Sequence, residues 1–505
     1  MLGLLLPTYA AANDLYIAQN AAGAGTGSNC SSPLAYTFFN VAGNWGNAAS
    51  QIGPGTTVHI CGTLTGAANS TMLTFQGDGA PGSPITLLFE ANAVLTDTNW
   101  AQAGAIYGGS SRNWVNVDGG NNGLIQNTAN GSSPNYPTQT DSAGVYFPTC
   151  SNCIVRNLTV SNLFVKTTSD SQGGGDAIDI HSGSNNTIYN NLIHDSQIGI
   201  IHNFGRSGSL QTGVSIYGNT IYRFNHAIAI GDLSTNSTFD SLKIYGNNIH
   251  DAANWDDVAN NNFHHNGIFV FTNNSSNHYT NLQIFNNYIY GDFGARETGH
   301  IFLDNEATDS NYNGALLFNN ILVDNSAANG PSNGFIITKD LSSSSAVGVY
   351  NNTMYFTTNV GSRCVMDQGA TLTLKNNVNF QCYAVYISSG ATSPATDYND
   401  YGSLSGIGGS ATLGAWQAAC GCDSHSSGSA PNLNLSSFAP NAGSPLVGAG
   451  INLRALAAGL SLDKLGTPRP LGSAWDIGAI QSGAPVSGGG GSLVPPPTVA
   501  ITSIK

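Results

Sequence analysis

The sequence predicts an all-β solenoid, a right-handed parallel β-helix with a cap at each end. Asparagine-marked turns recur along the middle of the chain, and an apolar strand stands on either side of nearly every turn. The turns are YNNLI 189–193, YGNTI 217–221, YGNNI 245–249, FNNYI 285–289, FNNIL 318–322, YNNTM 350–354 and KNNVN 375–379. Measured at Asn191, Asn219, Asn248, Asn287, Asn320, Asn352 and Asn377, they lie 25 to 39 residues apart. Repeats of this length indicate stacked coils.

The strands that flank the turns give each coil its order. VSIY, LKIY, LQIF, ALLF and VGVY precede turns, and AIDI 177–180, GIIH 199–202, AIAI 227–230, GIFV 267–270, HIFL 300–303 and FIIT 335–338 follow them. Coils stacked at about 4.8 Å would point Ile, Val and Leu inward and align the Asn amides in a ladder. A β-sandwich is the alternative, but its strands would recur every 8–12 residues or so, joined by hairpins.

The amino-acid composition and net charge restrict the compartment and the classes of partner that the protein can have. Only 8% of the 505 residues are charged and 62 are Gly, which favours a secreted β-rich scaffold, extracellular or periplasmic, over a cytoplasmic enzyme. One long solenoid domain needs no division, because a solenoid grows in one dimension. The net charge of −14 argues against a nucleic-acid partner, which rewards clustered Lys and Arg. It also weighs against a strongly polyanionic substrate, unless bound Ca²⁺ offsets the charge.

Eight cysteines form no paired zinc-ligand pattern, and we expect them to be disulfides. The predicted pairs are Cys30–Cys61, Cys150–Cys153, Cys364–Cys382 and Cys420–Cys422. Cys364 and Cys382 lie in consecutive coils, which brings their Cα atoms within about 4.4–6.8 Å of each other. The pairs point to an oxidising compartment.

The chain divides by composition into five segments. Residues 1–12 are apolar and Ala-rich like the end of a signal peptide, without its basic start. Residues 13–150 are expected to form an N-terminal cap and first coils, 151–400 the central coils, 401–482 the last coils and cap, and 483–505 a Gly/Ser/Pro tail of linker type. No other segment is apolar for long enough to span a membrane, and we expect a monomer.

The coil pattern and the closing segments SPLVGAG 444–450, DKLGTPRP 463–470 and WDIGAIQ 475–481 resemble secreted bacterial right-handed parallel β-helix proteins. That superfamily includes pectate lyases, polygalacturonases and other polysaccharide-active enzymes. The resemblance covers most of the chain and is specific for the fold, not for one activity. It implies a polysaccharide partner and a cleft between long loops and a strand face. GDAIDIH 175–181 resembles the acidic strand of polygalacturonases, but the DD and RIK elements that accompany it there are missing.

Three consecutive loops, which end at strands 267–270, 300–303 and 335–338, are longer than their neighbours and should form a wall beside the strand face. The first two are rich in functional side chains: His250, Asp251, Trp255, Asp256, Asp257, Asn262, His264 and His265, then Asp292, Arg296, Glu297 and His300. Glu occurs only at 90, 297 and 306 in the whole chain. A functional cluster is favoured over solvated loop charges.

Distance selects a catalytic pair. Glu297 and Glu306 flank strand 300–304, which separates them by roughly 15–20 Å, beyond the roughly 5–9.5 Å that glycosidase carboxylates require. Asp256 or Asp257 from the coil below is therefore expected to pair with Glu297, with Arg296 beside it. One of His264 and His265 should point outward, next to Asn266. General base, donor to a sugar hydroxyl, metal ligand and structural histidine all stay open for it.

Sugar binding is expected along an outward ladder of the strands that follow the turns. It comprises His181, Asn203, Gly231, Phe271, Asp304 and Lys339. Phe271 with Trp255 would form an aromatic platform, and Asn266, His300, Asp304, Lys339 and His181 would be polar anchors. Alternatively, Asp304 and Lys339 form only a cross-strand ion pair.

Three functions compete. The leading one is a glycoside hydrolase that acts on a neutral or weakly charged glycan and requires no cofactor, with Glu297 as acid and Asp256 or Asp257 as partner. The second is a polysaccharide lyase in which His264, His265, Arg296 or Lys339 abstracts a proton beside a uronate neutralised by Arg or Ca²⁺. The third is a non-catalytic glycan-binding surface protein or adhesin. The sequence leaves the sugar, the linkage and the stereochemical course open.

Overall fold

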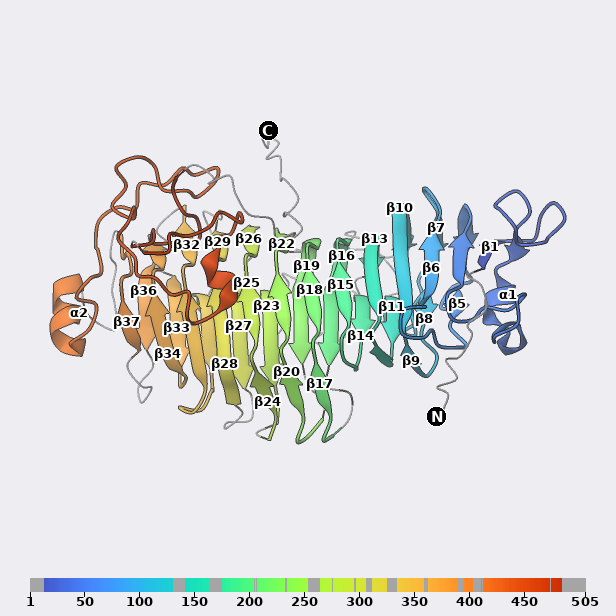
Figure 1. Cartoon of the computed structure of the whole chain (residues 1–505), viewed down its shortest axis with the longest axis horizontal. Coiled ribbons are helices and arrows are strands. Elements are labelled where there is room, and N and C mark those ends of the chain that lie inside the picture. Colours follow the sequence, from blue (N-terminus) through green and yellow to red (C-terminus); the bar gives the residue numbers. More distant parts are fainter. Residues whose placement is uncertain are drawn as a thin grey trace, which may run out of the picture. The chain divides into compact units, whose positions relative to one another are not determined.

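The computed structural model describes residues 13–129, 141–163, 175–203, 205, 207–231, 234–252, 264–274, 276–294, 297–305, 311–324, 334–357, 362–387, 394–402, 410, 412–472 and 474–483. Almost all of its regular structure consists of parallel strands stacked coil upon coil (Figure 1). The chain is a right-handed parallel β-helix, so the predicted fold class is confirmed. It forms two compact units, Met1–Gly205 and Arg206–Lys505, which are described separately.

The first unit contains strands of 2 to 13 residues. They are β1 Asp14–Ala18, β2 Leu34–Ala35, β3 Thr57–Ile60, β4 Thr63–Thr65, β5 Leu73–Thr74, β6 Ile85–Phe89, β7 Val94–Asp97, β8 Ile106–Tyr107, β9 Ser111–Asn113, β10 Val115–Asn127, β11 Ser142–Phe147, β12 Thr149–Ser151, β13 Ile154–Leu163, β14 Gly175–Ile180, β15 Thr187–Tyr189 and β16 Leu192–Asn203. Two short helices, α1 Thr37–Asn40 and η1 Ala42–Asn44, lie between β2 and β3.

Each side of the first unit is a parallel ladder. One ladder runs β1, β3, β6, β10, β13 and β15. A second runs β4, β7, β10, β13 and β16. The third runs β5, β8, β11, β14 and β16, and it carries the residues of greatest chemical interest.

The second unit repeats this arrangement. Its strands are β17 Leu210–Thr212, β18 Ser215–Tyr217, β19 Thr220–Gly231, β20 Thr238–Asp240, β21 Lys243–Tyr245, β22 Asn248–His250, β23 His265–Thr272, β24 His278–Thr280, β25 Gln283–Phe285, β26 Tyr288–Gly291, β27 Glu297–Asn305, β28 Asn311–Phe318, β29 Ile321–Asp324, β30 Gly334–Lys339, β31 Ala346–Tyr350, β32 Thr353–Phe356, β33 Arg363–Gln368, β34 Thr371–Lys375, β35 Val378–Phe380, β36 Tyr383–Ile387 and β37 Ala395–Asp397. Its helices are α2 Leu413–Cys420 and η2 Ala458–Ser461.

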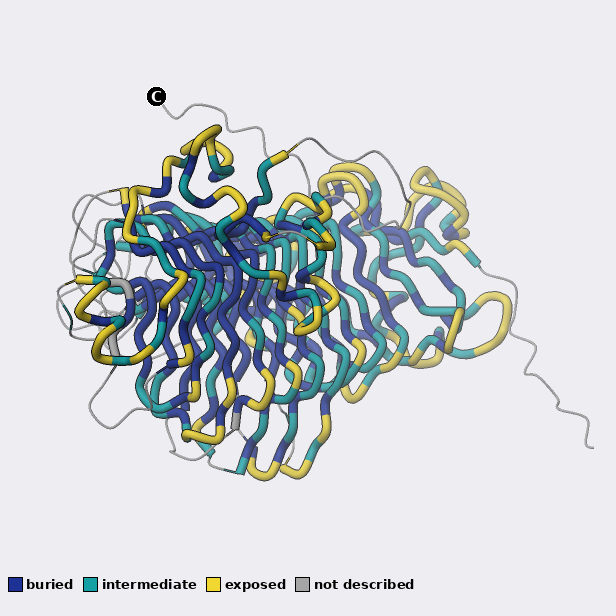
Figure 2. The backbone as a smooth tube through the Cα atoms, turned by 60° about the vertical axis from the view of Figure 1, so that its left-hand side comes forward, coloured by how far each residue is buried: buried dark blue, intermediate teal, exposed yellow. Residues whose placement is uncertain are grey.

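Three long ladders cross the second unit. Strands β18, β21, β25, β28, β31, β34 and β37 form the first. The second comprises β19, β22, β26, β29, β32 and β35. The third, β19, β23, β27, β30, β33 and β36, corresponds to the strands that the sequence places after each turn. Buried residues follow the strands and exposed residues gather at the turns (Figure 2).

Buried asparagines join consecutive turns of the second unit in one continuous ladder. Each side-chain Nδ2 donates to the Oδ1 of the next asparagine at 2.9–3.1 Å, through Asn219, Asn247, Asn287, Asn320, Asn352, Asn377 and Asn399. The predicted asparagine stack is therefore confirmed, with one shift. In the YGNNI turn the member is Asn247 and not Asn248, because Gly246 takes the left-handed position at φ 63°.

The third ladder of each unit is built from a six-residue segment, which we call the facing stretch. It comprises 176–181 and 198–203 in the first unit and 226–231, 266–271, 299–304, 334–339 and 363–368 in the second. Its second, third and fifth side chains are buried inside the coil, as with His300, Ile301 and Leu303, all 0% exposed. The first, fourth and sixth therefore face outward.

Glycines show the break in alternation at the start of this stretch. A Cβ atom on Gly267, a second position, would lie 3.0 Å from the side chain of Ile289, which is buried in the coil. A Cβ atom on Gly299, a first position, would instead lie 2.6 Å from Ile337, a fourth position. Neighbouring residues of a regular strand point to opposite sides. Because the second and third residues both point inward, the fourth and sixth residues lie on the same face as the first.

All four predicted disulfides are present. They are Cys30–Cys61, Cys150–Cys153, Cys364–Cys382 and Cys420–Cys422. The Cα atoms of Cys364 and Cys382 are 5.5 Å apart, within the predicted range, and no described cysteine is free.

Residues 444–472 and 474–482, which we call the C-terminal strap, run back across the turns of the second unit (Figure 1). The strap bonds to the left-handed residue of four successive turns. Lys464 donates to the carbonyl of Asn286, Asn319 donates to Leu462, Asn351 donates to Gly478, and Asn376 donates to Ile451.

The strap is also anchored by buried apolar and charged groups. Trp475 packs with Phe318 and Tyr350. Arg469, 1% exposed, donates to Asn319 Oδ1 at 3.0 Å and to the carbonyl of Gly478 at 3.0 Å. The strap is thus hydrogen-bonded to the solenoid along its length. No helix within the described part of the chain is long and apolar enough to cross a membrane.

Candidate functional site

Two aspartates face outward from β14 in the first unit. Asp176 and Asp179 occupy the first and fourth positions of the facing stretch, while Ala177, Ile178 and Ile180 fill the interior. Because two consecutive residues turn inward between them, both carboxyl groups lie on the same side of the sheet. One oxygen of each, Oδ1, is buried and has no hydrogen-bond partner among the described residues.

The surroundings of this pair favour protonated carboxyl groups. Burial, and next the charge of Asp141, raises the pKa of Asp176 to about 7. Burial and the charge of Asp176 raise the pKa of Asp179 well above its ordinary value. Two close carboxyl groups in a poorly solvated place cannot both ionise easily. One proton is therefore shared or held at this site near neutral pH.

Tyrosines line the next strands of the same face. Tyr146 on β11 is directly opposite Asp179, and Tyr107 on β8 is opposite Tyr146. Their rings are stacked with centroids 5.8 Å apart. Burial, and then the charge of Asp179, raises the pKa of the Tyr146 hydroxyl, which therefore remains a hydrogen-bond donor beside the carboxyl pair.

His181, at the sixth position of the same stretch, completes this cluster. Burial lowers its pKa, so the imidazole is neutral at neutral pH. Its Nδ1 lies 3.3 Å from Asn203 Nδ2, an arrangement in which the amide donates to the ring. The remaining ring nitrogen then carries the hydrogen and acts as a donor. We call Tyr107, Tyr146, Asp176, Asp179 and His181 the carboxylate cluster.

The second unit presents a different outward face. Its fourth positions form an apolar row of Phe269, Phe302, Ile337 and Met366, between 1% and 7% exposed. Phe271, a sixth position, is half-buried and stacks on Phe269 with centroids 4.6 Å apart. Its ring also covers Gly231, where a Cβ atom would lie 2.2 Å from it. We call this set the aromatic face.

Polar groups border the aromatic face on both sides. At one border, Asn266 Nδ2 lies 2.8 Å from His264 Nδ1 and 3.4 Å from His226 Nδ1. At the other, Lys339 Nζ lies 3.4 Å from Asp304 Oδ2 and 3.3 Å from Asp340 Oδ2. Burial, then the charge of His265, lowers the pKa of His264 to about 4, so this imidazole is neutral at neutral pH.

The predicted outward ladder is partly visible in these contacts. Phe271, Asp304 and Lys339 are directly opposite one another in register, as expected. His181 and Asn203 are neighbours in the first unit. Of the two adjacent histidines, His264 faces outward, as expected of one of them, while His265 is 0% exposed and its Nδ1 bonds to the carbonyl of Phe293.

The predicted position of Glu297 is wrong. It begins β27 instead of standing on an exposed loop, and it is 2% exposed. Its Oε1 lies 3.1 Å from Nε2 of the buried His300, without hydrogen-bond geometry. Burial, and then the charge of Asp324, raises the pKa of Glu297 well above its usual value.

His300 is likewise not a surface anchor for a sugar. It occupies an inward position, and its ring packs against Phe293 and Phe335 at centroid distances of 4.5 and 4.7 Å. The reason is the inward second position of the facing stretch, which simple alternation does not predict. Trp255, Asp256, Asp257, Arg296 and Glu306 lie outside the described residues, so their predicted roles are untested.

Sequence reasoning missed Asp176, Asp179, Tyr107 and Tyr146 as a cluster. GDAIDIH resembles the acidic strand of polygalacturonases, but the missing DD and RIK elements give no reason to assign its aspartates a role, and strict alternation places residues three apart on opposite sides of a strand. Aligning GDAIDIH with the later facing stretches would have shown the shared inward Ala and Ile positions. Among the described residues, no three His, Cys, Asp or Glu side chains are grouped so that they could hold a metal ion.

No protein-family model matches the sequence, and no curated protein matches it either. Solved structures share its general path. A pectate lyase, Pel9A, has a TM-score of 0.46 and 16% identity, over 94% of this chain and 98% of that chain. XylC in complex with xylose has a TM-score of 0.49 and 10% identity, over 93% and 98%. The Streptococcus pneumoniae adhesin PfbA has 0.45 and 12%, over 70% and 95%. Likenesses this distant carry no information on activity.

Proposed function

We propose that the protein is a glycoside hydrolase whose chemistry lies in the carboxylate cluster of the first unit. The observation that carries this proposal is the pair Asp176 and Asp179, which face the same side of one strand with a buried, unpartnered oxygen each. Glycoside hydrolysis requires one protonated and one ionised carboxyl group on either side of the bond that is cleaved. This pair supplies both states near neutral pH.

Asp179 is the proposed general acid. It is the more buried of the two, and the charge of Asp176 opposes its ionisation. Asp176, whose pKa is about 7, ionises more readily and is the proposed base or nucleophile. Groups whose surroundings hold their pKa values apart can divide acid and base roles in this way. The Tyr146 hydroxyl would orient the carboxyl pair or the sugar.

The proposed substrate is a neutral or weakly charged glycan. The stacked rings of Tyr107 and Tyr146 offer an apolar contact for a sugar, and His181 offers a donor for a hydroxyl group. Two carboxyl groups and a net charge of −14 disfavour a polyanion. Four disulfides suit an oxidising compartment, and we propose that the protein is secreted as a monomer.

The aromatic face of the second unit is proposed as a separate glycan-binding surface. Phe271 would provide the platform, and His264, Asn266, Asp304 and Lys339 the polar contacts. This keeps the binding roles expected of Phe271, Asn266, Asp304 and Lys339, and it does not use Glu297.

A lyase is the second candidate, and one observation favours it. His264 is neutral at neutral pH because its pKa is lowered to about 4, so it is able to accept a proton from a uronate. Partial burial lowers the pKa of Lys339, but the charges of Asp304 and Asp340 raise it by more, so the ammonium group stays protonated and does not accept a proton at neutral pH.

A panel of plant and microbial polysaccharides tests these proposals. New reducing ends without unsaturated products are expected, and Asp179→Asn should abolish them while His264→Ala should not. Ultraviolet absorbance from unsaturated uronates, lost in His264→Ala, would assign the protein to the lyases. Binding to a glycan without any cleavage would leave it an adhesin.

A further inference from the structure

The Cys420–Cys422 disulfide differs from the other three in its position and in the number of residues that separate its cysteines. It joins residues two apart, against separations of 31, 3 and 18 for the other pairs. It closes at the end of helix α2, where Gly421 takes the left-handed conformation at φ 64°. A disulfide stabilises a fold mainly by closing a loop of the unfolded chain, and the benefit falls as the loop shortens. This pair therefore contributes the least to stability.

Both of its cysteines are partly accessible. Cys420 and Cys422 are both half-buried, and a Cβ atom added to the intervening Gly421 would meet nothing within 4 Å. In Cys30–Cys61 only Cys30 is exposed and its partner is buried, and in Cys150–Cys153 and Cys364–Cys382 both partners are at most 2% exposed. An external thiolate can approach the exposed ring, and access is one condition for thiol–disulfide exchange.

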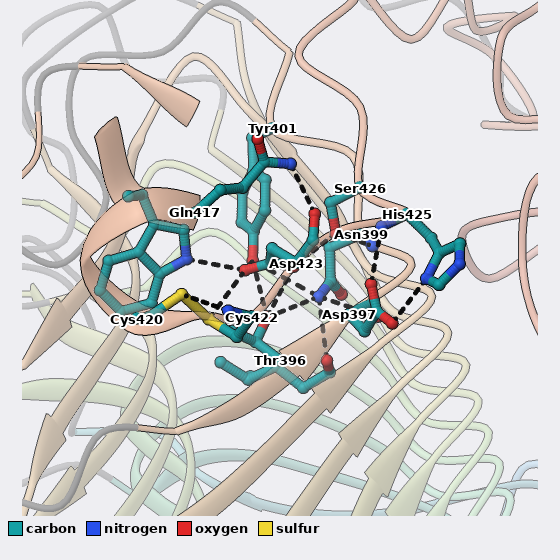
Figure 3. The surroundings of a disulfide bond; sticks show 12 residues. Thr396, Asp397, Asn399, Tyr401, Gln417, Cys420, Cys422, Asp423, His425 and Ser426 are labelled. Atoms are coloured by element: carbon teal, nitrogen blue, oxygen red, sulfur yellow. Dashed lines mark hydrogen bonds and ion pairs between the residues drawn. A yellow bond between two sulfur atoms is a disulfide. The ribbon is translucent and has the colours of Figure 1, made fainter. Parts of the chain in front are cut away.

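The structure around the ring is held without the disulfide (Figure 3). Asp423, 1% exposed, accepts hydrogen bonds from Trp416 Nε1 at 2.7 Å, Tyr401 Oη at 3.0 Å and Thr396 Oγ1 at 3.1 Å, and a further one from Ser426. The Asp423 carbonyl accepts from Gln417 Nε2 at 2.7 Å. These bonds fix both helix α2 and the residue after Cys422, so opening the ring leaves its ends in place.

The two sulfur atoms are not equivalent. The backbone N–H of Cys422 donates to Cys420 Sγ at 3.1 Å, which stabilises a thiolate on Cys420. Cys422 Sγ instead lies 4.0 Å from Asp423 Oδ2, whose negative charge disfavours a thiolate and accepts a thiol hydrogen. Cys420 is therefore the better leaving sulfur.

From this geometry we infer that Cys420–Cys422 is a redox-active site that exchanges with an external dithiol while the fold remains intact. One donor thiolate attacks Cys422 Sγ, forming a mixed disulfide and releasing Cys420 as a thiolate that takes up a proton. The second thiolate of the donor then attacks the donor sulfur that is bonded to Cys422. This forms the donor's disulfide and releases Cys422, which is protonated beside Asp423. Two electrons and two protons pass to the pair, and the donor leaves as a disulfide.

Residue-resolved alkylation of the full-length oxidised protein tests this. The protein is equilibrated with increasing dithiothreitol at pH 8, free thiols are trapped with one isotopic form of iodoacetamide, and the remaining cysteines are labelled with another after unfolding. Cys420 and Cys422 should become dithiol at a dithiothreitol concentration at least about tenfold below that which opens any other pair. The circular dichroism spectrum should not change, and removal of dithiothreitol in the presence of oxidised glutathione should restore the disulfide.

Simultaneous opening of all four pairs, or opening of Cys420–Cys422 only when the spectrum collapses, would overturn the inference. The double variant Cys420→Ala/Cys422→Ala should lose the ability to oxidise dithiothreitol stoichiometrically without added oxidant. The matched variant Cys30→Ala/Cys61→Ala should retain it. If the first variant does not fold, the labelling of the native protein decides alone, because it needs no substitution.

Discussion

The carboxylate cluster and the aromatic face are built on the same six-residue backbone pattern and carry opposite chemistry. In 176–181 the interior takes Ala, Ile and Ile while the outward positions are Asp, Asp and His. In 266–271 the interior takes Gly, Ile and Val while the outward positions are Asn, Phe and Phe. In these two stretches the inward positions take small or aliphatic residues, and the outward positions differ in chemistry.

The difference is energetic as well as chemical. Burial at the carboxylate cluster raises carboxyl pKa values and leaves an oxygen of each unpartnered, which costs stability. Burial at the aromatic face removes apolar rings from water and stabilises the coil. We expect substitutions in the carboxylate cluster to change reactivity and substitutions in the aromatic face to change stability or affinity.

The largest effect is expected from Asp179→Asn. If Asp179 donates the proton, its loss should lower turnover by a factor on the order of 10²–10⁴, with an unchanged circular dichroism spectrum. Initial rates of reducing-end release measure the loss. A glycan with an activated leaving group needs little protonation and should be partly rescued.

Two matched carboxyl variants of the second unit are the controls. Asp304→Asn and Glu297→Gln should keep near-full turnover, because Asp304 borders the aromatic face and Glu297 is enclosed beside His300. A large loss in Glu297→Gln together with full activity in Asp179→Asn would return the acid to the second unit and reject our assignment.

Phe269→Ala should instead affect stability. Phe269 is 6% exposed and contacts Phe271 and Phe302, and removing a buried Phe side chain costs about 3 kcal/mol or more. Urea denaturation should show a lower midpoint. The partner experiment, Tyr146→Phe, removes only a hydroxyl from the carboxylate cluster and should change the rate more than the midpoint. A reversed outcome would mean that the two faces have each other's roles.

The pH dependence of stability should have opposite signs at the two sites. Asp176 has a folded pKa of about 7, above its unfolded value of about 3.9. Its contribution is fully present below about pH 4 and is lost as the pH rises to about 7. His264 has a folded pKa of about 4, below its unfolded value of about 6.5. Its contribution is present above about pH 6.5 and is lost as the pH falls through about 4.

Urea denaturation between pH 4 and 8 separates the two. Asp176→Asn should remove a decline with rising pH, and His264→Gln should remove a rise, each at most about 1.4 kcal/mol per pH unit. Identical pH profiles in wild type and both variants would show that neither group titrates differently on folding.

The smallest effect is expected from Phe271→Ala. Phe271 is half-buried and lies at the rim of the aromatic face, so its loss should weaken glycan binding by several-fold, of the order of 1 kcal/mol. Affinity electrophoresis or calorimetry with the identified glycan measures this, and turnover at saturating substrate should not change. Unaltered affinity would exclude the aromatic face from glycan recognition.

The fold was predictable because its signals are local and repeated. An asparagine that bonds to the next coil recurs at nearly the same place in the turns. The positions of Asn287, Asn320 and Asn352 in the sequence therefore predict the asparagine ladder. The Cys364–Cys382 disulfide was predictable because its two cysteines lie in consecutive coils. Stacked coils convert sequence spacing into spatial adjacency.

The site was less predictable because it depends on one backbone bend. Two consecutive inward residues put Asp176 and Asp179 on one side of β14 and leave His300 inside the coil, while Glu297 is buried at the start of β27. Strict alternation would instead place Asp176 and Asp179 on opposite sides of the strand. The rarity of Glu drew attention to Glu297, but rarity alone does not show whether a side chain is exposed, and Glu297 is buried.

The strap has a consequence for how this protein can change length. Its hydrogen bonds to Asn286, Asn319, Asn351 and Asn376 reach four successive turns of the solenoid. Inserting or deleting one coil between Asn286 and Asn376 would displace turns from their hydrogen-bond partners in the strap. We therefore expect an inserted coil to be tolerated better before Asn286 than between Asn286 and Asn376.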